Sequence, residues 1–139
     1  MSTLLGAINA AASALDAQRA RMEVAVSNMA NAESTRGPDG QPYRRREVVL
    51  ETQTGDSFGG HIAASGVRVA QVVEDQSPFR RRLEPSHPDA DADGFVAVPN
   101  VDVPEEMVDM LGAARAYQAN LTAIGLIRDT VQKALDLAK

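Results

Sequence analysis

The sequence has no cysteine and no tryptophan, and aromatic residues make up only 4% of its 139 positions. A chain without cysteine forms no disulfide, no thiolate nucleophile and no cysteine-type zinc site. A domain that folds around its own core usually contains more large side chains. Alanine is abundant instead, and this composition predicts close, shallow packing between elements.

Long apolar runs and an excess of basic residues are also missing. No run of 18 apolar residues occurs, so the sequence predicts no transmembrane helix. The first basic residue is Arg19, and Asn9 interrupts the apolar start, which is unlike a secretory signal. The formal net charge of -5 argues against a nucleic-acid binder. We therefore expect a cytoplasmic protein or one exported without a cleaved signal peptide.

Proline divides the chain into three segments. All seven prolines lie between Pro38 and Pro104, and both ends are proline-free. We predict an N-terminal helical segment (1–35), a β-rich middle segment (36–99) and a C-terminal helical segment (100–139). The expected fold is mainly α with a small β-rich insertion that forms an outer domain, and the two long terminal helices pair as a coiled coil.

Apolar residues recur at alternating spacings of three and four in both terminal segments, which is typical of a coiled-coil seam. Arg19 and Arg128 each occupy one seam position. In an antiparallel pair Arg128 would lie near Ala12 and Arg19 near Leu121, with the arginine stems buried and the charged heads reaching solvent. They are either tolerated charges or residues that fix register against neighbouring chains. The expected assembly interface comprises Leu5, Ile8, Leu15, Met22, Val26, Met29, Met107, Met110, Leu111, Tyr117, Leu121, Ile124, Val131 and Leu135.

The start of the second helix and the strands of the middle segment have local signals. Asp102 and Glu105 have capping-box spacing, with Pro104 in the first turn. Short strands are predicted at 48–50, 67–73 and 95–98, and mobile linkers at 55–60 and 85–94. The basic triplets 44–46 and 80–82 are predicted to be exposed charges that protect strand edges.

The middle segment also contains the one pattern that resembles a metal site. Asp89, Asp91, Asp93 and Gly94 match the opening of an EF-hand loop, but the twelfth position holds Asn100 instead of glutamate. A solvated acidic turn is therefore favoured over a calcium site. The two histidines, at 61 and 87, have no partner three or four residues away. The sequence thus predicts no catalytic, cofactor-binding or metal-binding residue.

Several motifs, in order along nearly the whole chain, resemble one family. The run 27–32 is similar to the N-terminal signature of flagellar axial proteins, and the stretches 42–45, 77–80, 87–91, 99–107 and 115–120 resemble the FlgC family of proximal-rod proteins within that group. The residues that carry the resemblance include Ser27, Asn28, Ala30, Asn31, Pro42, Tyr43, Pro99, Asn100, Glu106, Tyr117, Gln118 and Asn120.

The resemblance implies a structural subunit of the flagellar basal-body rod. Its paired helices would form a tubular inner layer that transmits torque across the periplasm around the export channel. The implied partners are other proximal-rod proteins, the basal rod adaptor at the membrane ring, the distal rod, further copies and the flagellar type III export apparatus. Nucleic acid and small-molecule substrates are not expected. The alternatives are another axial subunit, a calcium-binding coiled-coil module and a cytoplasmic coiled-coil dimer.

Overall fold

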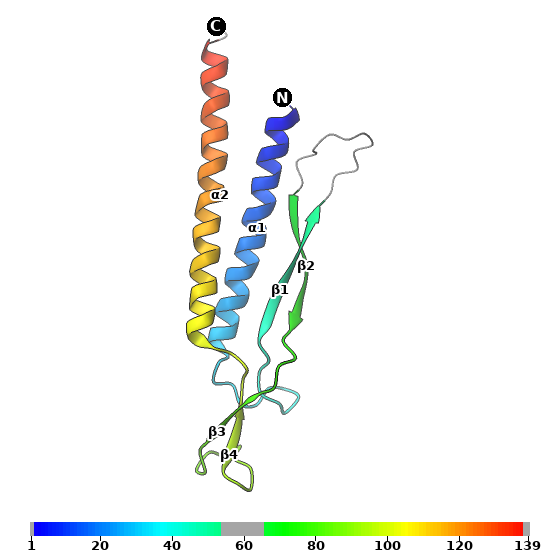
Figure 1. Cartoon of the computed structure of the whole chain (residues 1–139), viewed down its shortest axis with the longest axis vertical. Helices are drawn as coiled ribbons and strands as arrows, with labels where there is room; N and C mark the ends of the chain where they lie inside the picture. Colours follow the sequence, from blue (N-terminus) through cyan, green and yellow to red (C-terminus); the bar gives the residue numbers. More distant parts are fainter. Residues whose placement is uncertain (1, 54–65, 138–139) are drawn as a thin grey trace.

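The computed structural model describes residues 2–53 and 66–137, which form two long helices and four strands. The elements are α1 (Ser2–Ala30), β1 (Arg46–Gln53), β2 (Gly66–Glu74), β3 (Arg80–Leu83), β4 (Phe95–Val98) and α2 (Val103–Leu137). The two helices run antiparallel, so both chain ends lie at the same end of an elongated molecule (Figure 1). The β1–β2 hairpin lies along α1, and the β3–β4 hairpin lies beyond the opposite end of the helix pair.

Local hydrogen bonds explain where the helices end and begin. The backbone N–H of Asn31 donates to the carbonyl of Ser27 at 3.1 Å, and its side-chain amide donates to the same carbonyl at 2.8 Å. Asp102 caps α2, because its carboxylate accepts the N–H of Glu105 at 3.3 Å. Pro104 lies in the first turn, where a missing N–H costs little. The predicted cap is confirmed. Neither described helix has a stretch apolar enough to span a bilayer.

The four strands form two antiparallel hairpins and confirm the predicted β-rich middle. Arg46 pairs with Glu74 in the first hairpin, which has a bulge between Val49 and Leu50. Arg80 pairs with Val98 in the second. The segment 85–94, predicted to be a mobile linker, is a turn closed by backbone hydrogen bonds of 2.8 and 2.9 Å. The other predicted linker, at 55–60, lies outside the described residues.

The core contains only small and medium-sized side chains. Among the described residues, the buried hydrophobic ones are Ala17, Ala25, Val96, Val98, Val101 and Ala113. No described leucine, isoleucine, methionine or aromatic residue is fully buried. Buried alanines allow close helix approach but remove little apolar area from water, so this chain leaves most of its large apolar side chains partly solvated.

About half of the residues in the predicted coiled-coil seam are half-buried, and the others are exposed. In α1 its members at 8, 15, 22 and 29 are half-buried, but those at 5, 12, 19 and 26 are exposed. In α2 the members at 110, 117, 124 and 131 are half-buried, whereas Met107, Leu121, Arg128 and Leu135 are exposed. The most buried residues of α2 are Glu106 and Ala113, one residue before the predicted positions. The antiparallel pair is therefore observed, but not the full coiled-coil seam.

The two seam arginines are not buried in the helix pair, contrary to prediction. The side chain of Arg19 is 71% exposed and bonds Glu23 at 2.9 Å, and that of Arg128 is 81% exposed and lies 3.4 Å from Asp129. The pKa of Arg19 is raised, first by its hydrogen bond to Glu23 and further by the charge of Glu23. Both guanidinium groups pair with a carboxylate on their own helix, so neither arginine depends on the opposite helix for a partner.

Candidate assembly surface

Large apolar side chains remain exposed along both helices. Those on α1 and α2 are Leu4, Leu5, Val26, Val103, Met107, Val108, Leu111, Leu121, Leu126, Leu135 and Leu137. We call this set the outer apolar surface. It includes Leu5, Val26, Met107, Leu111, Leu121 and Leu135 from the expected assembly interface, while the other predicted members are half-buried.

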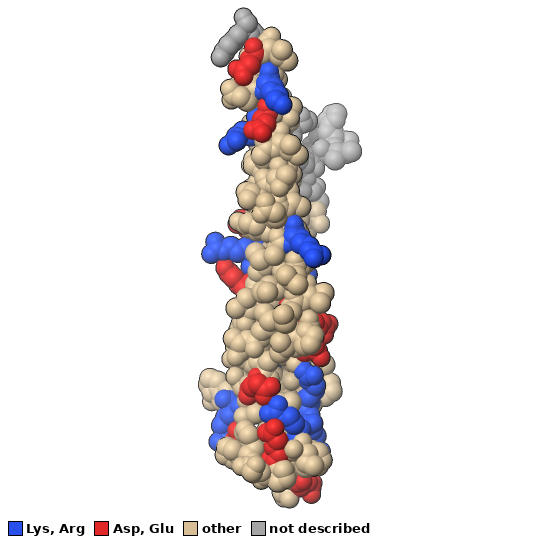
Figure 2. Space-filling view, turned by 90° about the vertical axis from the view of Figure 1, so that its left-hand side faces the viewer, with Lys and Arg blue, Asp and Glu red and all other residues tan. Residues whose placement is uncertain are grey.

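Charge is sparse on the outer side of α2. The stretch 116–127 contains no charged residue. Figure 2 shows this side as a largely uncharged surface interrupted by a few charged groups, with charge densest at the lower end, where β3 and β4 lie. Covering an uncharged, partly apolar helix face with another helix is favourable, because apolar area is removed from water and no charge has to be desolvated.

The helix ends nearest the strands are joined by a buried polar cluster centred on Asn28. We call Asn28, Tyr43, Arg45, Asn100 and Glu106 the polar junction. The Asn28 amide donates to Glu106 Oε2 and to the Arg46 carbonyl, both at 2.9 Å. Its oxygen accepts the Tyr43 hydroxyl and the Arg46 N–H, both at 3.0 Å. All the hydrogen-bonding capacity of this amide is used.

Arg45 extends the junction from the strand side. Its Nε donates to Glu106 Oε1 at 2.5 Å, and its backbone N–H donates to Asn100 Oδ1 at 2.8 Å. The same guanidinium also pairs with Glu47 and lies 3.6 Å from Asp109. Burial disfavours the charged guanidinium, but the hydrogen bond and charge of Glu106 outweigh this, so the pKa of Arg45 is raised. Glu106 is 2% exposed and is thus a paired buried charge.

The junction brings together several residues of the sequence signature. Asn28, Tyr43, Asn100 and Glu106 meet there, Ser27 lies 3.4 Å from the Tyr43 hydroxyl, and Asn31 caps the adjoining helix end. Pro99 is buried beside it. Three signature residues on α2, Tyr117, Gln118 and Asn120, lie several turns away, and Asn120 donates to the carbonyl of Ala116 on its own helix at 2.9 Å.

The burial of Arg45 was not predicted from the sequence. The triplet 44–46 was predicted to be exposed, which holds for Arg46 but not for Arg45, whose side chain is 13% exposed. Arg44 places its guanidinium 4.3 Å from the centre of the Phe79 ring, a cation–π contact. In the second triplet Arg80 and Arg81 are exposed as predicted, whereas Arg82 is half-buried. Arg81 and Arg82 pair with Asp91 and Glu33 at 2.6 and 2.9 Å.

The acidic loop is a turn in which Asp91 and Asp93 are exposed, as predicted, but its carboxylates also form hydrogen bonds and ion pairs. Asp89 is only 21% exposed, accepts the Thr35 hydroxyl at 2.9 Å and lies 3.4 Å from Arg36. Asp91 accepts the backbone N–H groups of Phe95 and Asp93 at 2.8 and 3.0 Å. The N–H of Phe95 is the main cause of the lowered pKa of Asp91, and Arg81 adds to it. Within residues 2–53 and 66–137 no acidic or histidine cluster has metal-site geometry.

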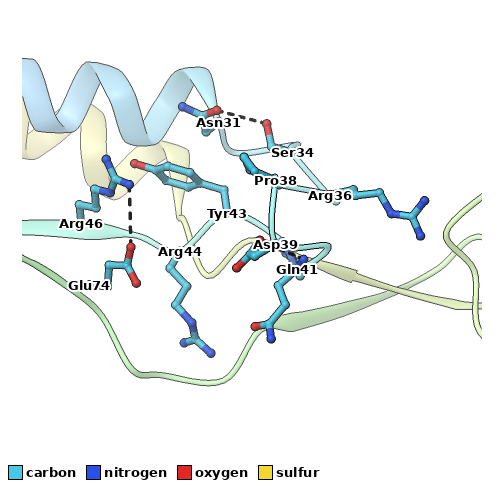
Figure 3. A pocket seen from close by; sticks show the side chains of 12 residues that line it. Asn31, Ser34, Arg36, Pro38, Asp39, Gln41, Tyr43, Arg44, Arg46 and Glu74 are labelled. Carbon is cyan, nitrogen blue, oxygen red and sulfur yellow. Dashed lines mark hydrogen bonds and ion pairs between the residues drawn. The ribbon is translucent and has the colours of Figure 1, made fainter.

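A polar hollow of about 520 Å³ opens beside Tyr43. Figure 3 shows Arg36 pointing away from it and Arg46 directed at Glu74, 3.8 Å away. Arg44 donates to the backbone carbonyls of Asp75 and Ser77 at 3.3 and 3.4 Å. Because these arginines already have partners and carboxylates share the rim, the hollow is no ready-made anion site.

Models of known protein families match both ends of the chain. A model described as "Flagella basal body rod protein" matches residues 8–38, and one described as "Flagellar basal body rod FlgEFG protein C-terminal" matches residues 92–137. The flagellar basal-body rod protein FlgC of Salmonella typhimurium is 46% identical over 136 residues, 98% of each chain. Those of Bacillus subtilis and Borreliella burgdorferi are 41% and 39% identical, covering 99% and 95% of each chain. The chain belongs to the FlgC family of flagellar basal-body rod proteins.

Membership in the FlgC family makes the chain a structural rod subunit of the flagellar basal body. The resemblance predicted from the motifs is confirmed. The two matched segments meet in the polar junction, because Asn28 belongs to the first and Glu106 to the second. Residues far apart in the FlgC-family sequence thus form one contact at the base of the helix pair.

Proposed function

We propose that the chain polymerises through the outer apolar surface of its terminal helices. In this proposal residues 1–35 and 100–139 form the inner, tubular layer of the rod around the export channel, and residues 36–99 form the outer domain. Neighbouring subunits cover the apolar rows that the single chain leaves exposed, and the continuous wall carries torque across the periplasm.

The exposure of large apolar side chains on both helices carries this proposal. The described core is limited to three alanines and three valines. Burying apolar area contributes about 25 cal/mol per Å². Leu126 and Val108, 64% and 68% exposed, have most of their area still to bury. A neighbouring helix is the surface that fits a row of such side chains.

The family supports a particular set of partners and a route. We assign as neighbours the other proximal-rod proteins, the basal rod adaptor at the membrane ring and the distal rod, and we assign the flagellar type III apparatus as the exporter. Export without cleavage is part of the proposal, and the intact mass of the subunit in purified rods tests it. No catalytic, cofactor, nucleic-acid or small-molecule role is assigned.

Leu121→Asp tests the assembly surface. Leu121 is 46% exposed in the single chain, so a carboxylate there stays hydrated until a neighbour covers it. Burying that charge without a partner would cost several kcal/mol. We expect a folded, exported subunit, no rod beyond the membrane ring, and cells that do not swim.

Leu83→Asp is the matched control, because Leu83 is also exposed but lies on β3, away from the helices. We expect this variant to build rods. Normal swimming of the Leu121→Asp strain, with the substituted subunit present in its purified rods, would contradict the proposed surface.

A further inference from the structure

The fully buried apolar residues of the helix pair do little to fix its register, and the large members of the predicted seam are at most half-buried. The fully buried hydrophobic residues on the two helices are alanines, at 17, 25 and 113. Distinct large knobs that fit distinct holes specify register in paired helices, and a face of methyl groups does so weakly. A shift of one helix by one turn, about 5 Å, would therefore meet little resistance from the fully buried apolar side chains.

The polar junction has the opposite character. Asn28 is 1% exposed and makes four hydrogen bonds, to partners on both α2 and the β1 strand. The carboxylate of Glu106 is shared between Asn28 and Arg45, one oxygen to each. A one-turn shift would break the Asn28–Glu106 contact and leave polar groups buried without partners.

We propose that Asn28, Arg45 and Glu106 form a register lock that sets α1 against α2. Arg45 comes from the chain entering β1, so the lock also fixes the first hairpin to the helix pair. These three are positioning residues. The lock is a property of the single chain. It also holds the apolar rows of α1 and α2 at one fixed offset, and the importance of that offset for assembly rests on the proposed function.

Two spin labels can read the register directly, because the chain has no cysteine of its own. Glu23→Cys and Thr122→Cys place labels at exposed positions on α1 and α2. The two sites are offset along the helix axis, so a slip changes their separation almost one for one. Pulsed electron–electron double resonance on the full chain should give one narrow distribution of distances between the two labels.

The lock is removed with Asn28→Leu, Arg45→Met and Glu106→Leu together, since apolar residues of similar size can replace a buried polar triad without unfolding a protein. We expect helix content to be kept and a second distance to appear, displaced by about 5 or 10 Å, one turn or one heptad.

A control triple variant, Glu33→Leu with Arg82→Met and Glu84→Leu, removes a partly exposed ion-pair cluster outside the helix pair and should leave the distance unchanged. If the first triple variant loses helix content, Arg45→Met with Glu106→Leu is measured instead, because Asn28 then keeps three of its bonds. A single native distance in either folded variant, or a broad distribution in the unchanged chain, overturns the lock. Neither outcome depends on rod assembly.

Discussion

The hydroxyl of Ser13 on α1 accepts a 3.0 Å hydrogen bond from the backbone N–H of Val67, the second residue of β2. The same hydroxyl donates to the carbonyl of Ala10 at 2.8 Å. A helix side chain thus satisfies a strand amide and ties the first hairpin to α1. This contact lies at the far end of the hairpin from the polar junction, so the hairpin is held to the helix at both ends.

Ser13→Ala should release that end of the hairpin. The N–H of Val67 would lose its acceptor, and we expect the free energy of unfolding to fall by about 1 kcal/mol. Amide exchange at Val67 should become faster. Thr130→Ala is the control, since its hydroxyl donates to the carbonyl of Leu126 on the same helix. Unchanged exchange at Val67 would show that the Ser13 hydroxyl does not hold the strand.

Two glycine substitutions should have opposite effects. A Cβ on Gly66 would lie 2.9 Å from the Ser13 hydroxyl oxygen, whereas a Cβ on Gly112 meets nothing within 4 Å. Gly66→Ala should therefore destabilise the chain, by about 1–3 kcal/mol. Gly112→Ala should stabilise it by up to about 1 kcal/mol through helix propensity. Thermal unfolding of the two variants tests both signs, and a stable Gly66→Ala protein would contradict the close approach.

The sequence predicted the elements of this fold better than their faces. Helix lengths follow from an uninterrupted 3.6-residue pattern and from signals such as the Asp102 cap. Each helix has one row of residues whose burial is predicted wrongly, because apolar character is the guide to the buried face. In α2 the apolar pattern places Met107 in the interface, although the charged Glu106 is the buried residue. In a chain that leaves many large apolar side chains exposed, apolar character alone does not indicate which helix face is buried.

The polar junction could be predicted only in part. Asn28 and Glu106 were recognised as members of a signature, but nothing in their spacing of 78 residues indicates that they touch. Arg45 differs from its neighbours in the triplet only by the direction of its side chain, which strand geometry and the position of α2 decide. A contact that joins three segments depends on the tertiary fold, and one sequence without relatives cannot supply it.

The acidic loop should contribute to stability unevenly. Asp89→Asn weakens the contacts to Thr35 and Arg36, and we expect a loss of roughly 1 kcal/mol, because the carboxylate is largely shielded from water. Asp93→Asn, at an exposed position, should change nothing measurable. Equal melting temperatures for the two variants would contradict this expectation.

Calorimetry with calcium on the unchanged chain should show no binding heat. Tight binding of calcium would favour a metal-binding role for the acidic loop.

Acid should loosen the second hairpin through Asp91. The pKa of Asp91 is lowered in the folded chain by the N–H of Phe95 and by Arg81. Its carboxylate therefore stabilises the fold above its unfolded value of ~4, and this contribution is lost as the pH falls through the lower folded value. Carboxyl titration by NMR should show the lowered midpoint. Asp91→Asn should remove this part of the acid dependence, and an unchanged acid profile in that variant would exclude Asp91 as its source.

Order in the isolated chain should decrease along the helices away from the polar junction. Near it, Asn28 and Glu106 are buried and joined to the strands, so amides around 25–30 and 106–113 should exchange slowly. At the other end Leu5 is 62% exposed and Leu137 is 89% exposed, so little apolar burial offsets the cost of ordering, about 1–2 kcal/mol per residue.

Amides in 4–12 and 126–137 of the dilute chain should therefore exchange much faster than those near the junction. We expect neighbours in the assembled rod to supply the missing burial, so that folding of the far ends is coupled to binding. Both ends should then be protected equally, which exchange measured on purified basal bodies can test. Equal protection along both helices of the monomer would mean that the pair is already complete without neighbours, and that the outer apolar surface is not what orders it.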